Sequence, residues 1–202
     1  MFVHDKAPAL LTKEEFIKKY NPYDTYSYDT RHEYIKECGW GVITKEQVEI
    51  LSSFLFGTKV IEVCSGLGFL ASHLRDYGVT DYLAFDNFTK CYPSEGFLNY
   101  GSVDRNVHSV NVAKAEAIVM CWPNYESNLA ETVVKKMRKG QYLIYQGEGW
   151  GGCTANDKFF EQITNKKKFQ EIRNLSERLN NYQVQWFGIN DYFMVYKKLT
   201  NR

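Results

Sequence analysis

The stretch Lys59-Val-Ile-Glu-Val-Cys-Ser-Gly-Leu-Gly-Phe-Leu70 joins a β-branched apolar run to a short turn with two glycines and then to the start of a helix. Val60–Val63 predict a strand that is buried on both faces, as in a parallel sheet. Gly66 and Gly68 let the backbone approach a ligand closely or adopt positive φ. The stretch therefore predicts a nucleotide-binding turn between a strand and a helix.

The residues that follow complete a βαβ unit. Phe69–Tyr77 predict a helix with one apolar face, and Gly78 is a suitable stop for it. Tyr82–Asp86 predict a second strand that ends in an aspartate. Asp86 lies 24 residues beyond Glu62, at the spacing expected for a carboxylate that binds a ribose.

This unit resembles the first half of the class I S-adenosylmethionine (SAM)-dependent methyltransferases. In that family an acid precedes the glycine-rich turn and a second acid, at the end of the next strand, binds the ribose hydroxyls. The resemblance implies these roles for Glu62 and Asp86. The family's first turn glycine is Cys64 here, and we expect this residue to have negative φ. The residues that the resemblance places around SAM are Glu62, Cys64, Ser65, Gly66, Gly68, Asp86, Asn87, Asn111, Cys121 and Trp122.

Two different interpretations of the turn remain open. Gly66–Ala71 also fit the G-x-G-x-x-A form of a dinucleotide-binding fingerprint, so a nicotinamide enzyme is a competitor. A dehydrogenase normally adds a second domain for its substrate, whereas 202 residues accommodate one α/β domain. The turn is also compatible with an ordinary strand–turn–helix that binds nothing.

Composition and charge restrict the class of protein. Hydrophobic residues make up 44% of the chain, no apolar run approaches the ~20 residues of a membrane span, and 25 basic against 24 acidic residues give a net charge of +1. A membrane protein is not expected, and nucleic acid is a possible but not a favoured partner. We expect a monomer or a weak homo-oligomer.

The cysteines and histidines are scattered along the chain. The cysteines are odd in number, and neither residue type shows the paired spacing of a metal site. This usage favours a reducing, cytoplasmic location and predicts no metal. The residues are Cys38, Cys64, Cys91, Cys121, Cys153, His4, His32, His73 and His108.

Residues 1–43 predict a short helix and an aromatic segment ahead of the SAM-binding domain, which is expected over residues 44–202. A capping box at Thr12 and Glu15 starts a helix that runs to about Tyr20. Residues 21–31 have no clear period and predict an aromatic loop. In the family that the chain resembles, helices before the first strand carry a segment that closes over the ligand. Because of its tyrosines and irregular pattern, we expect residues 21–41 to form part of a lid over the donor site.

The second half of the chain predicts further strands and helices. A third strand is expected around residues 106–111, a fourth over 117–122, a helix from about Ser127, a fifth strand over 142–146, and a helix capped by Thr154 and Asp157. Residues 182–187 and 192–196 predict a terminal antiparallel hairpin, which is characteristic of class I methyltransferases. The predicted fold is α/β, with a Rossmann-like, seven-stranded, mostly parallel sheet, helices on both faces and this hairpin at the end.

Acceptor-side residues are expected on loops that follow the fourth and fifth strands. Trp122-Pro-Asn-Tyr125 resembles the Asn/Asp-Pro-Pro-Tyr/Trp motif of amine methyltransferases, with departures at its first and third positions. Glu148 lies in a loop with four glycines in Gly147–Gly152. We expect Asn124, Tyr125 and Glu148 to act on the acceptor. Alternatively, Pro123 only ends the strand and the glycine-rich segment is a surface loop.

The resemblance implies methyl transfer from SAM to a small planar molecule or a protein side chain. A nucleotide or RNA end could also be the acceptor, because aromatic residues stack on bases. The same residues are compatible with a SAM-binding but non-catalytic interaction subunit and, less favourably, with an NAD(P)-binding oxidoreductase.

Overall fold

A mixed sheet forms the centre of the molecule. The computed structural model describes residues 2–4, 6–86, 98–100, 103–104 and 110–201. The seven strands of the main sheet lie in the order β5-β3-β2-β6-β7-β9-β8, and β9 is antiparallel to both of its neighbours. They are β2 (Val60–Val63), β3 (Tyr82–Phe85), β5 (Val103–Asp104), β6 (Ala117–Cys121), β7 (Tyr142–Glu148), β8 (Phe169–Glu171) and β9 (Asp191–Lys198). A separate pair joins β1 (Phe2–His4) to β4 (Leu98–Tyr100) in parallel.

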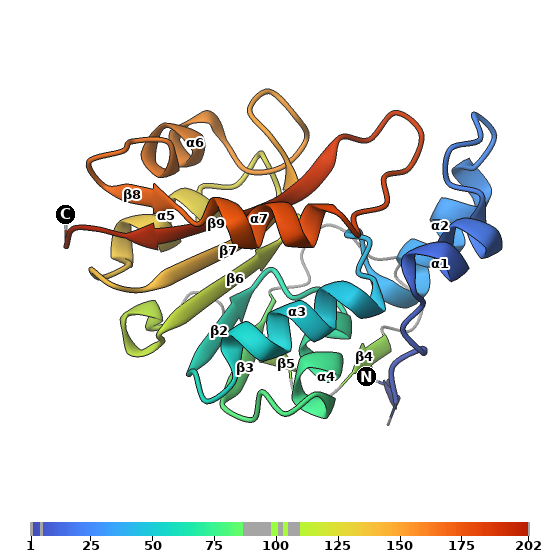
Figure 1. Cartoon of the computed structure of the whole chain (residues 1–202), viewed down its shortest axis with the longest axis horizontal. Coiled ribbons are helices and arrows are strands. Elements are labelled where there is room, and N and C mark those ends of the chain that lie inside the picture. The colour runs from blue at the N-terminus through green and yellow to red at the C-terminus, as the bar shows by residue number, and fades with distance from the viewer. Residues whose placement is uncertain (1, 5, 87–97, 101–102, 105–109, 202) are drawn as a thin grey trace.

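Helices cover both faces of the sheet, as predicted. Side chains that alternate along a strand enter two different apolar clusters: Val119 of β6 packs on one side, and Ile118 and Met120 pack on the other. The face turned to the viewer in Figure 1 carries α3 (Lys45–Leu55), α4 (Phe69–Asp76) and α7 (Arg173–Asn180). The opposite face carries α5 (Leu129–Lys136), α6 (Asp157–Ile163) and the 3₁₀ turn η2 (Val112–Lys114).

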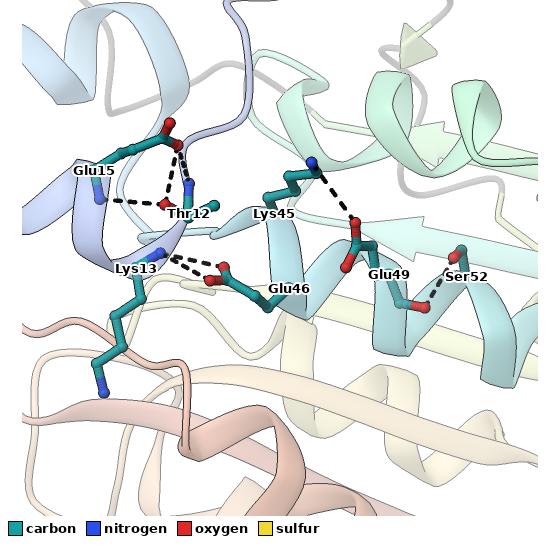
Figure 2. Close-up of polar contacts among 7 residues, drawn as sticks. All are labelled: Thr12, Lys13, Glu15, Lys45, Glu46, Glu49 and Ser52. Atoms are coloured by element: carbon teal, nitrogen blue, oxygen red, sulfur yellow. Dashed lines mark hydrogen bonds and ion pairs between the residues drawn. The ribbon is translucent and has the colours of Figure 1, made fainter.

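The N-terminal helices, α1 (Lys13–Tyr20) and α2 (Tyr28–Cys38), lie at the side of the sheet (Figure 1). The predicted capping box of α1 is present, with Thr12 and Glu15 satisfying each other's backbone N–H groups. Figure 2 shows this box and, beside it, the backbone N–H of Lys13 donating to the carboxylate of Glu46 on α3. The N-terminus of α1 is therefore hydrogen-bonded to α3, the helix that precedes β2.

A third apolar cluster joins this N-terminal part to the C-terminal half. It contains Phe16, Tyr20, Tyr34 and Val42 from the N-terminal part and Val184 and Trp186 from the segment before β9. The Trp186 ring centroid lies 5.6 to 6.1 Å from those of Phe16, Tyr20 and Tyr34, within the range of favourable aromatic pairs.

The predicted terminal hairpin is wrong. Residues 182–187 form no strand, and β9 instead pairs with β7 and with the short β8, which precedes α7. Glutamines alternate with apolar or aromatic side chains over residues 182–186, as in a strand, but this alternation has another cause. Val184 and Trp186 point into the third cluster and pack on helices rather than on a neighbouring strand.

Three smaller predictions also need correction or fall outside the structure. Helix α2 occupies residues 28–38, although residues 21–31 were expected to be a loop. The N-cap of α6 is Asn156, whose side chain accepts the N–H of Phe159, and not Thr154, which is buried. Most of the third strand expected around residues 106–111 lies outside the described residues, and residues 110–111 are not in a strand.

Candidate functional site

A cavity of about 550 Å³ opens at the carboxyl ends of β2, β3 and β6, where ligands bind in open α/β sheets. Its volume lies within the usual range for small-molecule sites. Several parts of the chain line it, among them the turn after β2, Asp86 after β3, the start of α4 and the segment from the end of β6 to the start of α5. The last residue of α2, Cys38, and the residues that follow it, Gly39, Trp40 and Gly41, line it as well.

The turn after β2 bends sharply and is held by Asp86. Cys64 has φ 62°, so the prediction that it has negative φ is wrong. The turn requires the left-handed conformation that glycine adopts freely, and cysteine adopts it at a cost of roughly 1 kcal/mol. Two residues later, the N–H of Gly66 donates to Oδ2 of Asp86 at 2.8 Å. The carboxylate at the end of β3 is thereby fixed against the turn at the end of β2.

Gly68 is required by packing and does not line the cavity. Its φ is 80°, and a Cβ there would lie 2.7 Å from the carbonyl oxygen of Tyr100 and 2.8 Å from Cγ2 of Val103. Such distances are closer than van der Waals contact allows. The second glycine of the turn therefore makes room for the chain near β4 and β5, and Gly66 is the one that faces the cavity.

Glu62 lies on the cavity floor and is 1% exposed. Its Oε2 accepts the hydroxyl of Tyr82 at 3.0 Å. Burial raises the pKa of Glu62 to about 7, against the opposing effects of the Tyr82 hydrogen bond and the Arg75 charge. A buried carboxylate of this kind favours a cationic ligand, because a positive charge nearby stabilises its ionised form.

Ser65 supplies a second polar group on the cavity wall. Its Oγ is buried and has no hydrogen-bond partner among the residues described. Unsatisfied buried polar atoms are uncommon in native structures and call for a cause. Together with the carboxylate of Asp86, this hydroxyl forms a polar edge that suits a ligand carrying hydroxyl groups.

Trp122, at the end of β6, adopts φ 49°, an uncommon conformation for a large side chain and one that tends to occur at functional sites. Its indole Nε1 donates to Oδ2 of Asp191 at 3.2 Å, and Nε2 of Gln146 donates to the same oxygen at 2.7 Å. Asp191 is 1% exposed, and burial raises its pKa to about 6. This network fixes the indole at the cavity wall.

The three residues expected to act on the acceptor are placed differently from one another. Asn124 lines the cavity, and its Oδ1 accepts the N–H of Glu126 at 2.8 Å. Tyr125 is 52% exposed and is not part of the lining. Glu148 is not part of the lining either. It lies at the end of β7, and its two oxygens accept the N–H groups of Cys153 (2.6 Å) and Asn190 (3.2 Å).

The residues expected to hold the donor are mostly brought together. Glu62, Cys64, Ser65, Gly66, Asp86, Cys121 and Trp122 all line the cavity. Asn111 does not line it, because its side chain caps η2 by accepting the N–H of Ala113. Asn87 lies outside the described residues.

Sequence reasoning missed three parts of this site. Trp40 and Gly41 belonged to the expected lid, but nothing singled them out. Asp191 falls in the turn expected between the two strands of the hairpin. Its contacts with Gln146 and Trp122 join residues that are distant in sequence, and such contacts leave no local signal. Tyr82 stood in a predicted strand, and its pairing with Glu62 follows only from the strand register.

The described ranges contain neither a metal-binding cluster nor a membrane-spanning helix. No three or more His, Cys, Asp or Glu side chains among them gather in an arrangement able to hold a metal ion. No helix in the described part of the chain is long and apolar enough to cross a membrane.

Comparison with known proteins finds similarity to solved structures and none to protein-family models or curated sequences. A SAM-dependent O-methyltransferase from Thermotoga maritima is similar with a TM-score of 0.50 and 12% identity, over 80% of this chain and 68% of that chain.

Two more solved structures are similar at TM-scores below 0.5. One is an rRNA methylase from Streptococcus thermophilus (TM-score 0.44, 12% identity, 79% of this chain and 100% of that chain). The second is an N-methyltransferase from Bradyrhizobium japonicum (TM-score 0.45, 10% identity, 76% and 92%). The likeness to the Thermotoga enzyme identifies the fold of this chain as that of the SAM-dependent methyltransferases.

Proposed function

We propose that the chain binds SAM in the cavity and transfers its methyl group to an acceptor. The observation that carries this proposal is the contact between the Asp86 carboxylate and the Gly66 N–H on the wall of a cavity of about 550 Å³. It places an acid from the end of β3 beside the turn after β2, where a ribose would be held. The fold of the Thermotoga enzyme supports the same assignment.

The polar groups of the cavity suit the parts of SAM. Asp86 would accept hydrogen bonds from ribose hydroxyls, and Ser65 Oγ, a buried atom with no hydrogen-bond partner among the described residues, would bond to the ligand. Glu62 would complement positive charge, which SAM carries on its sulfonium and amino groups. Cys121 and Trp122 supply apolar and aromatic surface beside them.

A nicotinamide cofactor is less favoured by the sheet. Dinucleotide-binding folds have the parallel strand order 3-2-1-4-5-6. Here the last strand in the chain, β9, lies antiparallel between β7 and β8.

SAM, when bound, supplies an electrophilic methyl group, so the protein needs mainly to align the acceptor with it. Asn124 and Trp122 line the cavity just after the end of β6 and are the proposed acceptor contacts. The exposed Tyr125 between Asn124 and Glu126 would contact a larger acceptor. We assign Glu148 to positioning, because both of its oxygens hold backbone N–H groups of neighbouring loops. A small planar molecule is the preferred acceptor class, ahead of a protein side chain, a nucleotide or an RNA end.

Replacement of Asp86 by alanine tests the donor site. A hydrogen bond to a charged group is worth about 1.5–3 kcal/mol, so we expect Asp86→Ala to weaken SAM binding by ~10- to 100-fold in calorimetry. Asp81→Ala is the matched control, because Asp81 precedes the same strand and pairs on the surface with Lys59. Equal affinity in the two variants, or tighter binding of NAD than of SAM, would contradict the proposal.

Mass spectrometry of the ligand retained during native purification gives an independent check. SAM or S-adenosylhomocysteine (SAH) is expected. If SAM binds but labelled SAM transfers no methyl group to metabolite, protein or RNA pools, a non-catalytic SAM-binding role replaces methyl transfer.

A further inference from the structure

Besides Ser65 Oγ, three buried polar atoms in the region of α2, the segment after it and the start of β9 have no hydrogen-bond partner among the described residues. They are Nε of Arg31, Nε1 of Trp40 and Oδ1 of Asp191. The first two are donors and the third is an acceptor. Each such atom destabilises the folded protein by roughly 1–3 kcal/mol unless a group outside the described residues satisfies it.

These atoms belong to one contiguous cluster. The indole rings of Trp40 and Trp122 are stacked, with centroids 5.9 Å apart and planes inclined by 25°. The guanidinium of Arg31 lies 5.5 Å from the first ring and 6.0 Å from the second. Trp122 is in turn hydrogen-bonded to Asp191.

Two members of the cluster, Trp40 and Trp122, line the cavity together with Gly41, whereas Arg31 and Asp191 contact these rings and are not themselves among the lining residues. A further buried atom without a partner among the described residues, Oε1 of Gln146, lies against Gly41, because a Cβ at Gly41 would lie only 2.2 Å from it. The cluster thus combines two donors and one acceptor with the planar aromatic surface of the two indoles.

Resting on the proposed function, we infer that this cluster is the acceptor subsite and that it recognises the edge of a planar cyclic amide. Such an edge carries a carbonyl next to an N–H. The carbonyl would accept from Arg31 and Trp40, the N–H would donate to Asp191, and the ring plane would pack on the indoles.

Charge supports a neutral ligand rather than an ionic one. Burial lowers the pKa of Arg31, while the carboxylates of Asp191 and Glu148 act in the opposite direction and stabilise its charge. The cation of the cluster thus already has counterions, Asp191 within the cluster and Glu148 outside it. A second charge brought in by a ligand would have to be desolvated without a partner, which is costly.

Uracil and 1,3-dimethyluracil are suitable probes, because they share a ring plane and carbonyl groups and differ in the N–H groups. Each is titrated by calorimetry into protein saturated with SAH. We expect uracil to bind at least ~10-fold more tightly than its dimethyl derivative, because methylation removes the donor and leaves a buried acceptor unpaired.

Three variants test the residues through the two affinities and their ratio. Asp191→Asn can keep the bonds at Oδ2 while presenting a donor in place of the Oδ1 acceptor, so it is expected to reduce the ratio by at least ~5-fold, the equivalent of one hydrogen bond. Trp40→Phe removes only the indole N–H, and Arg31→Lys keeps the charge but not Nε. Both probes carry the carbonyl that accepts from these donors, so each of these two variants is expected to weaken both probes by at least ~5-fold and to leave the ratio unchanged. Trp150→Phe and Asp81→Asn, which lie elsewhere, should change neither affinity.

The subsite is refuted if uracil fails to bind at millimolar concentration, if both probes bind equally, if folded Asp191→Asn keeps the wild-type ratio, or if folded Trp40→Phe and Arg31→Lys bind both probes as tightly as the wild type. SAH binding without probe binding refutes the subsite and leaves the proposed function intact. If SAH itself does not bind, the proposed function fails, and the same titrations on the ligand-free protein then decide whether the cluster binds cyclic amides at all.

Discussion

Glu62 links the cavity to the pH dependence of stability. Its pKa is raised by burial from 4.5 to about 7, so between these values the folded protein binds a proton that the unfolded chain has released. The free energy of unfolding therefore falls as the pH rises from about 4.5 to 7. Above pH 7 the ionised Glu62 destabilises the folded protein by the full amount. We expect Glu62→Gln, which can still accept from the Tyr82 hydroxyl, to remove this slope, with a gain of at most about 3 kcal/mol at pH 8 relative to pH 4.5.

Denaturant unfolding from about pH 4 to about pH 8, a range that brackets both pKa values, measures the effect. Glu49→Gln is the control, because Glu49 lies on α3 with its side chain half exposed. Parallel stability profiles for the wild type and Glu62→Gln would show that the Glu62 carboxyl does not titrate abnormally in the folded state.

Two glycines with similar φ angles allow the stability cost of backbone strain to be measured separately from the cost of a steric clash. Gly68 has φ 80° and a crowded Cβ position, whereas Gly57 has φ 70° and nothing within 4 Å of an added Cβ. Gly57→Ala is expected to lose about 1 kcal/mol of stability from φ alone, and Gly68→Ala should lose that and about 1–3 kcal/mol more from overpacking. Thermal or urea unfolding gives both values, and equal losses would contradict the close approach of the chain at Tyr100.

At the scale of elements, Glu148 joins the end of β7 to two loops. Its oxygens accept the N–H groups of Cys153 and Asn190, and a glutamine has only one oxygen to offer. Glu148→Gln is therefore expected to lose about 1–3 kcal/mol of stability, because one backbone N–H is left facing a donor. Urea unfolding measures the loss, with the exposed Glu161 of α6, changed to Gln, as control. Unchanged stability with lost methyl transfer would instead restore Glu148 as a catalytic group.

The sequence predicted the parts of the fold that depend on local pattern. The turn, the helix stop at Gly78 and the capping box at Thr12 involve neighbouring residues, and each is present. The positive φ of Cys64 could not be predicted from residue type, because the geometry of the turn imposes a left-handed conformation that cysteine disfavours. The false hairpin arose because an alternating pattern is also produced by packing against helices, and Trp186 makes such contacts only after the chain has folded. Distant pairs such as Trp122 and Asp191 have no local signal.

At the scale of the whole molecule, the third apolar cluster connects the N-terminal part to the segment before β9, and we predict that it controls how firmly residues 21–41 close over the cavity. Residues 38–41 line the cavity, and the helices before them are anchored through Trp186 to the segment that precedes β9. We expect SAH to slow hydrogen exchange in residues 21–41, because a segment that closes on a ligand is drawn from marginally stable structure. Equal exchange with and without SAH would refute the lid.

Trp186→Ala then tests the anchor. Loss of a buried tryptophan typically costs about 3–5 kcal/mol, and here we expect the loss to act mainly on residues 11–43, whose amides should exchange faster while those of β6 and β7 keep their protection. SAH affinity should fall in proportion to the fraction of molecules in which the lid remains docked, because only those molecules bind SAH fully. Trp150→Ala, at an exposed position, is the control. If β6 and β7 lose protection together with residues 11–43, the N-terminal part is not a separate lid, and the molecule unfolds as one cooperative unit.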